Sequence, residues 1–191
     1  MLIVIIGTYF FIIKLDKRGS IMTKWKKFLK EWGFPVLIAI FLAILINKFL
    51  VFKVKIPSES MAPTLNIGDR LLAHRVYNLK KLSRGDLIIF YYEPKDQLYI
   101  KRLIGLPGDE VVIKNGEVIV NGEVLTEEYV KYDMFFNGQF KIPPGQYFLL
   151  GDNRDNSSDS RFWDYPYIDS DVIRGKAFLK IYPFNDIGVV K

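Results

Sequence analysis

The chain has 191 residues but contains no cysteine and a single histidine, His74. The absence of cysteine excludes disulfide bonds and thiolate chemistry, so an ordinary apolar core must stabilise the fold. His74 lies between Ala73 and Arg75 in a predicted strand, where we interpret it as a structural residue. With one imidazole available, a Ser–His–Asp triad is disfavoured.

Basic residues are in the minority outside the N-terminal part of the chain, although the formal net charge is +6. Residues 1–55 contain ten Lys or Arg and two acidic residues, whereas residues 56–191 contain seventeen basic and nineteen acidic residues. A nucleic-acid-binding face would need its positive charge in the larger region. The charge distribution therefore argues against nucleic acid as a partner.

One long segment lacks acidic residues and is almost free of polar ones. Residues 33–52 have the sequence GFPVLIAIFLAILINKFLVF, in which Asn47 and Lys48 are the polar exceptions. A helix of about 20 apolar residues spans a hydrocarbon core of roughly 30 Å, and Lys48 can extend its amine to the interface. A buried helix of a soluble protein would show a polar face, which this segment does not. We therefore predict a transmembrane helix over residues 33–52.

The charges that flank this segment set the expected topology. Seven Lys or Arg lie within residues 14–30, before the helix, and an excess of basic residues marks the cytoplasmic side. We expect a single-pass protein of the cell membrane, with residues 1–32 cytoplasmic or interfacial. Residues 53–191 are then expected to form an extracytoplasmic domain.

The first thirteen residues, MLIVIIGTYFFII, are apolar but short for a second span. They lack the basic leader and the small-residue cleavage site of a secretory signal. We interpret residues 1–21 as an extension upstream of a natural start at Met22, or else as a segment that lies in the membrane interface.

After residue 52 the sequence changes to short runs rich in Val, Ile, Tyr and Phe, bounded by turn residues, a pattern typical of strands. Asn-Gly pairs at Asn115–Gly116 and Asn121–Gly122 separate three of these runs. Asn-Gly favours a two-residue hairpin because both turn residues need a positive φ. We predict a mainly β fold: an antiparallel, barrel-like sheet domain preceded by one N-terminal transmembrane helix. The predicted strands are residues 69–76, 86–92, 97–104, 110–114, 117–120, 140–142, 146–150 and 176–182.

Two serines, Ser58 and Ser60, lie between prolines in the segment IPSESMAPTL, residues 56–65. Proline fixes its own φ and restricts the residue before it, so Pro57 and Pro63 predict a stiff loop. A serine nucleophile needs a base to accept its proton. Without a suitable histidine, the remaining common base is a desolvated lysine.

The segment YIKRLIGLPGD, residues 99–109, offers a lysine in an apolar strand. Side chains alternate along a strand, so Lys101 shares a face with Tyr99 and Leu103, whereas Arg102 lies on the opposite face, also between apolar residues. Periodicity does not decide which of the two is buried, but arginine stays protonated and cannot be a base. Lys101 is a candidate base, and a charge on an edge strand is the alternative.

The segment GDNRDNSSDSR, residues 151–161, combines acidic, basic and hydroxyl side chains. Such a composition is normal for a polar loop of Asx turns. A calcium loop that starts at Asp152 or Asp155 is excluded, because neither register has glycine at its sixth position or a carboxylate at its twelfth. The segment suits an ion-paired scaffold that holds a hydroxyl against another polar group.

Together these segments resemble the bacterial type I signal peptidases, which are membrane-anchored serine proteases with a Ser–Lys dyad. PSESMAPTL is similar to the family's serine motif, YIKRLIGLPGD to its lysine motif and GDNRDNSSDSRFW to its C-terminal motif. RGDLIIFYYEP, residues 84–94, is similar to the motif between the first two. The motifs occur in the family's order. The interval between the lysine motif and the C-terminal motif is short, as in the compact Gram-positive members of the family.

The resemblance implies a membrane-bound serine endopeptidase that cleaves signal peptides from exported preproteins after small residues, at sites of the Ala-X-Ala type, through an acyl-enzyme. It implies that Ser60 is the nucleophile and Lys101 the general base. Ser58 and the backbone N–H of Ser60 would form the oxyanion hole, and Ser157 would orient the lysine amine. The implied supporting network consists of Arg102, Asp152, Asp159 and Arg161. The implied substrate-pocket residues are Ile56, Met61, Leu65, Tyr99 and Ile100.

The resemblance implies no cofactor and no metal. The expected partners are preproteins that carry signal peptides, the lipid bilayer and the secretion translocon. One departure from the family is Asp164, where the family usually has glycine. Two other interpretations remain: a different Ser–Lys protease, such as a self-cleaving repressor, and a non-catalytic membrane-tethered β-domain. The membrane span argues against the first, and the second would not need Ser60 and Lys101 together.

Overall fold

The structure is a computed structural model that describes residues 3–6, 9–12, 25, 27–130 and 135–190. It divides into two units, Met1–Ile46 and Asn47–Lys191, which are described separately. The first unit begins with an antiparallel pair of strands, β1 (Ile3–Ile6) and β2 (Tyr9–Ile12). The expected start at Met22 lies outside the described residues, as does most of the basic flank.

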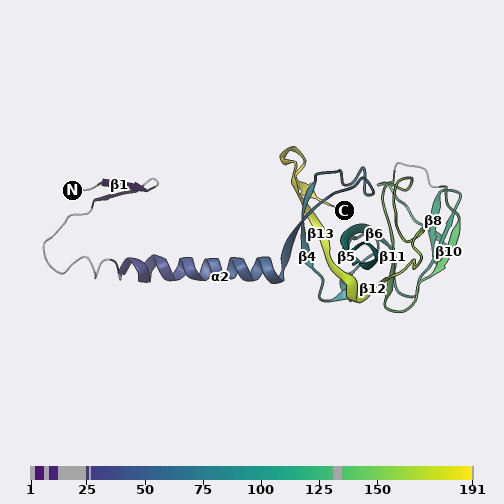
Figure 1. Ribbon diagram of the computed structural model, residues 1–191, viewed down its shortest axis with the longest axis horizontal. Coiled ribbons are helices and arrows are strands. Elements are labelled where there is room, and N and C mark those ends of the chain that lie inside the picture. The colour runs from purple at the N-terminus through teal and green to yellow at the C-terminus, as the bar shows by residue number, and fades with distance from the viewer. Residues whose placement is uncertain (1–2, 7–8, 13–24, 26, 131–134, 191) are drawn as a thin grey trace. The chain divides into compact units, whose positions relative to one another are not determined.

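The apolar segment forms a helix, as predicted, but ends three residues early. The π-helical turn η1 (Leu29–Gly33) continues into α2 (Phe34–Phe49) (Figure 1). Within the described residues this is the one helix long and apolar enough to cross a membrane, with a mean hydropathy of 2.0. Residues 51 and 52, predicted as helical, instead begin β3 (Val51–Lys55), which pairs with β4 (Arg70–Arg75). A β-branched and an aromatic residue favour a strand once a partner strand is present.

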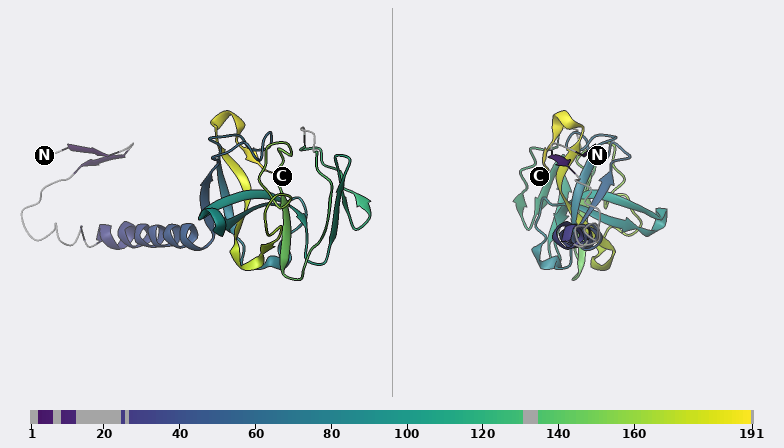
Figure 2. Two further views of the ribbon diagram at one scale, coloured as in Figure 1. Left: turned by 45° about the vertical axis from the view of Figure 1, so that its right-hand side comes forward. Right: turned by 90° about the vertical axis from the view of Figure 1, so that its left-hand side faces the viewer.

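In its described residues, the second unit is built from two antiparallel sheets. The larger has the strand order β12-β11-β6-β5-β13-β4-β3, with β14 also paired to β13, and the smaller has the order β10-β7-β8-β9. Figure 1 and the left view of Figure 2 place the smaller sheet on the side of this unit away from β4 and β13. The strand bounds are β5 (Leu87–Tyr92), β6 (Gln97–Gly105), β7 (Glu110–Lys114), β8 (Glu117–Val120), β9 (Glu123–Val124), β10 (Gly138–Lys141), β11 (Gln146–Leu150), β12 (Ile168–Asp169), β13 (Ile173–Tyr182) and β14 (Gly188–Val189).

The mainly antiparallel β fold is confirmed, and β7, β8 and β11 have the predicted bounds. The two Asn-Gly hairpins are confirmed as well. Asn115 and Gly116 have φ values of 52° and 84°, and Asn121 and Gly122 have values of 52° and 86°, as a type I′ turn requires. The short strands β12 and β14 were not predicted, because two residues carry too little periodic signal. β9 was expected only as the third of the runs that the Asn-Gly pairs separate.

Among the described residues, three buried apolar clusters support the larger sheet and its loops. One contains Ile56, Met61 and Leu65 from the serine segment together with Ile100 of β6. A second packs under the opposite face of β6 and includes Leu103, and the third joins the smaller sheet to β11. The serine segment is therefore fixed to the same core as the middle of β6.

Candidate active site

The serine loop follows β3 and is anchored on both sides of Ser60. Ile56, Met61 and Leu65 are almost fully buried, and the Leu65 N–H donates to the Met61 carbonyl at 2.8 Å. Ser58 is exposed and Ser60 is half-buried between these anchors. The apolar side chains on either side of the two serines are held in the core, and both serine hydroxyls therefore face away from it.

Three of the expected substrate-pocket residues lie beneath the serine loop. Ile56, Met61 and Leu65 lie in the core and do not line the cleft at the serine loop, whereas Tyr99 and Ile100 do. The three core residues are large and apolar, and their burial fastens the loop. The assignment of Ile56, Met61 and Leu65 to the substrate pocket stays a prediction.

Both charged residues of β6 are buried, but their partners differ. The Arg102 guanidinium donates to both oxygens of Asp152, at 2.7 and 2.6 Å. The Lys101 amine donates to the Ser157 hydroxyl at 3.1 Å. The side chain of Lys101 is 3% exposed and that of Arg102 is 1% exposed. Strand periodicity left open which of the two is buried, and the structure buries both. The arginine has a carboxylate as its partner, whereas the lysine amine donates to a neutral hydroxyl.

The surroundings of Lys101 favour its uncharged form. Burial lowers the pKa of the Lys101 amine from 10.5 to about 8, because a low-dielectric site penalises the ammonium. The Asp159 carboxylate opposes this effect, the Arg161 guanidinium adds to it, and the Asp152 carboxylate opposes it again. A substantial fraction of the amine is thus neutral near pH 8.

The serine loop and Lys101 meet at one open cleft of about 620 Å³. The hydroxyls of Ser58 and Ser60 are 3.3 Å apart at its wall. Within the described part of the chain, no hydrogen bond joins Ser60 to the Lys101 amine, whose side-chain partner is Ser157. Catalytic hydrogen bonds commonly tighten only when substrate is bound. The cleft is lined by Lys53, Val54, Lys55, Pro57, Ser58, Glu59, Ser60, Gln97, Leu98, Tyr99, Ile100, Lys101, Asn156 and Ser158.

Gly151 allows the serine loop and the C-terminal loop to touch. A Cβ at this position would stand 2.1 Å from the Ser157 hydroxyl oxygen and 2.4 Å from the Ser60 carbonyl oxygen, distances that real side chains do not adopt. The Asn153 backbone N–H donates to the same Ser60 carbonyl at 3.2 Å. Gly151 therefore lies between the Ser157 hydroxyl, which accepts the hydrogen bond of Lys101, and the backbone of Ser60.

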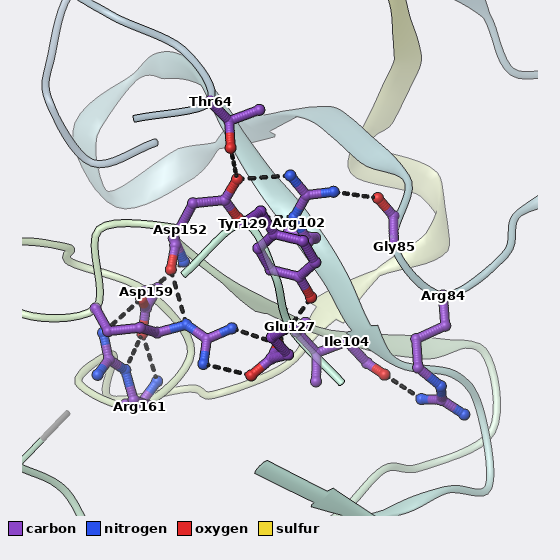
Figure 3. A network of polar contacts seen from close by, with 12 residues as sticks. Thr64, Arg84, Gly85, Arg102, Ile104, Glu127, Tyr129, Asp152, Asp159 and Arg161 are labelled. Atoms are coloured by element: carbon purple, nitrogen blue, oxygen red, sulfur yellow. Dashed lines mark hydrogen bonds and ion pairs between the residues drawn. The ribbon is translucent and has the colours of Figure 1, made fainter. Parts of the chain in front are cut away.

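The predicted supporting residues form two buried ion pairs. Arg102 pairs with Asp152, whose carboxylate also accepts a hydrogen bond from Thr64 at 2.6 Å. Arg161 pairs with Asp159 at 2.8 Å, and Asp159 accepts the backbone N–H of Gly151 at 3.0 Å. Figure 3 shows both pairs.

Comparison with known proteins decides the family. The model for signal peptidase, peptidase S26, matches residues 29–182. The chain belongs to the signal peptidase family. It is therefore a hydrolase, a serine protease that cleaves signal peptides from preproteins.

Individual relatives of the chain are signal peptidases as well. Signal peptidase I T of Bacillus subtilis is 38% identical over 173 residues, which cover 84% of this chain and 89% of that relative. Signal peptidase I of Leptolyngbya laminosa is 37% identical over 161 residues, which cover 79% of this chain and 78% of that relative. A crystal structure of a signal peptidase I from Enterococcus faecalis is 31% identical and covers 52% of this chain and 98% of its own, with a TM-score of 0.46.

Two further residues of this signal peptidase were singled out by sequence. His74 is exposed on β4, with its ring 5.7 Å from that of Phe178, and does not line the cleft. Asp164 is exposed in a bend next to the buried Trp163 and does not adopt a positive φ. An aspartate therefore fits the position without backbone strain.

Sequence reasoning missed two residues of the polar network, Glu127 and Tyr129. Glu127, Tyr129 and Arg154 are linked to one another and to the buried ion pairs. Arg154 lies inside the C-terminal motif, but Glu127 and Tyr129 lie about 25 residues before it. A glutamate in a polar stretch gives no periodic signal, so its buried partner could not be predicted.

Proposed function

We propose that this signal peptidase uses Ser60 as its nucleophile and Lys101 as its general base. The neutral amine accepts the Ser60 proton as the hydroxyl attacks the scissile carbonyl, and an acyl-enzyme forms. The protonated amine then gives its proton to the leaving amine, and water hydrolyses the acyl-enzyme with Lys101 as base again. The Ser58 hydroxyl and the Ser60 backbone N–H donate to the oxyanion in each tetrahedral intermediate.

One observation supports this assignment above the others: a lysine that is 3% exposed has a serine hydroxyl as its side-chain hydrogen-bond partner and opens on the cleft of the serine loop. A buried ammonium is strongly disfavoured without a carboxylate partner. Such a site is costly for stability alone, and a neutral amine beside a hydroxyl is what a serine nucleophile requires.

The sheet topology supports substrate binding as an extended strand. The Arg102–Gly105 half of β6 pairs with β11, whereas Gln97–Lys101 pairs with β5 on one side only. β3 is an edge strand of the same sheet, and residues of both strands line the cleft. A peptide can bind to such an edge through backbone hydrogen bonds. The bound strand would cover Lys101, and Tyr99 and Ile100 would receive the small side chains of an Ala-X-Ala site.

The anchor helix and the charge distribution support the proposed location. The helix Leu29–Phe49 is apolar enough to span a membrane, and seven basic residues precede it within residues 14–30. These features favour a cytoplasmic N-terminus and an extracytoplasmic β domain in the cell membrane. In that arrangement the enzyme meets preproteins in the bilayer as they leave the secretion translocon.

Cleavage of a purified preprotein tests the proposal directly. The full chain in detergent should release the mature protein, with the new N-terminus following a small residue, as determined by N-terminal sequencing. Ser60→Ala and Lys101→Ala should each lose nearly all activity because the two act as a unit. Ser58→Ala should lose about 10²–10³ in kcat.

His74→Asn is the matched control, because it removes the one imidazole of the chain and should leave the rate unchanged. Full activity of purified Lys101→Ala, or loss of activity in His74→Asn, would contradict the assignment of the base.

A further inference from the structure

A short segment outside the sequence motifs contacts the buried polar network. Residues 125–130, here called the strap, follow β9 of the smaller sheet. The strap is tied to that sheet by the Leu125 N–H, which donates to the Val118 carbonyl at 2.8 Å. Glu127 of the strap contacts the C-terminal loop, and Tyr129 contacts the larger sheet (Figure 3).

Glu127 holds the arginine of the C-terminal loop with both of its oxygens. The Arg154 guanidinium donates to the two carboxylate oxygens at 2.8 and 2.5 Å, and the side chains are 1% and 9% exposed for Arg154 and Glu127. Burial alone would lower the pKa of Arg154, but the hydrogen bonds and charge of Glu127 raise it above its ordinary value. The arginine therefore stays charged and fixed in a two-pronged contact.

Tyr129 links Glu127 to the charged residue that follows Lys101. Its hydroxyl donates to Glu127 at 2.7 Å, and its ring covers the Arg102 guanidinium at 3.7 Å. Burial, and then the Glu127 carboxylate, raise the pKa of the Tyr129 hydroxyl far above its ordinary value. Tyr129 is thus a permanent hydrogen-bond donor in the strap.

Arg154 passes this constraint to the candidate dyad. Its Nε donates to the Gly151 carbonyl at 3.0 Å, and Gly151 is wedged between the Ser157 hydroxyl and the Ser60 carbonyl. Ser157 in turn accepts the hydrogen bond of Lys101. A displacement of Gly151 would therefore move both the serine loop and the group that orients the amine.

We propose that Glu127 and Tyr129 are positioning residues, through which the strap holds the C-terminal loop in the geometry that catalysis needs. The inference rests on the proposed roles of Ser60, Ser157 and Lys101. A buried ion pair adds little net stability compared with apolar residues of similar volume, so stability alone does not account for this one. A fixed geometry does, because a shift of about 1 Å at an active site can cost about 10² in rate.

The test compares Glu127→Gln with Glu128→Gln in the full chain, using preprotein cleavage. Glu128 is the exposed neighbour in the strap and its variant should behave as wild type. Glu127→Gln keeps the side-chain volume but removes the charge, and kcat per folded molecule should fall about 10-fold to 10²-fold while KM stays within about twofold, since the substrate edge of β6 is untouched. The acid limb of kcat/KM should also move to higher pH, because a loosened loop admits water to Lys101.

Tyr129→Phe and Arg154→Lys decide the matter if Glu127→Gln does not fold. The first keeps the ring over Arg102 and loses one hydrogen bond, and the second keeps the charge and loses the two-pronged contact; both should lower kcat and move the acid limb. Variants that unfold at lower temperature but keep the wild-type kcat and acid limb would overturn the inference. Lys101→Ala in the same assay separates the two proposals: if it stays active, the assignment of the base fails, whatever the strap variants do.

Discussion

At the scale of single residues, Lys101 is unfavourable for stability because its environment disfavours its charge. Its pKa is lowered by burial from 10.5 to about 8. Below pH 8 the folded and unfolded chains both hold the proton, and the folded chain bears the full cost of a buried ammonium. Between pH 8 and 10.5 the unfolded chain binds more protons than the folded one, so stability rises with pH and the cost disappears.

Lys101→Met should therefore be inactive but more stable than wild type. At roughly 1.4 kcal/mol per pKa unit, the gain at pH 7 is about 3 kcal/mol and shrinks toward zero as the pH rises through 10.5. Urea unfolding of the full chain in detergent at pH 7 and pH 10.5 measures the difference. A variant less stable than wild type at pH 7 would show that burial of the charged Lys101 amine does not lower the stability of the fold.

At the scale of elements, the site depends on a close approach of two loops at the end of β11. Gly151→Ala would place a methyl group against Ser157 and the Ser60 backbone. A rotamer change cannot relieve the clash with the Ser60 carbonyl, because that atom belongs to the backbone. We expect a loss of about 10² or more in kcat, measured by preprotein cleavage.

Gly188→Ala is the matched control, because a Cβ there meets no atom within 4 Å and the φ is not positive. It should leave kcat unchanged. A Gly151→Ala enzyme of normal activity would contradict the close approach.

The same elements show how far the sequence determines the fold and the site. Alternation of apolar residues and the Asn-Gly pairs predicted β7, β8 and β11 well, since both signals are local. The end of the helix was misjudged because Val51 and Phe52 become strand only through pairing with β4. The strap could not be predicted either, because Glu127 and Arg154 are 27 residues apart and only the folded chain brings them together.

At the scale of the whole molecule, an anchor unit precedes a β unit that contains every candidate catalytic residue. The proposed topology predicts that protease added to intact spheroplasts digests the β unit, whereas a tag before Met22 stays protected until the membrane is broken. Replacing the basic residues within 14–30 by glutamine should weaken this orientation. Protection of the β unit in intact spheroplasts would reverse the topology and place the site on the wrong side for exported substrates.

The pH dependence of kcat/KM tests the central claim, a neutral amine at Lys101, most directly. The rate should fall about tenfold per pH unit below a limb near pH 8, in wild type and His74→Asn alike, because the protonated amine cannot accept the Ser60 proton. A rate that is independent of pH between 6 and 9, or a limb that disappears in His74→Asn, would contradict it.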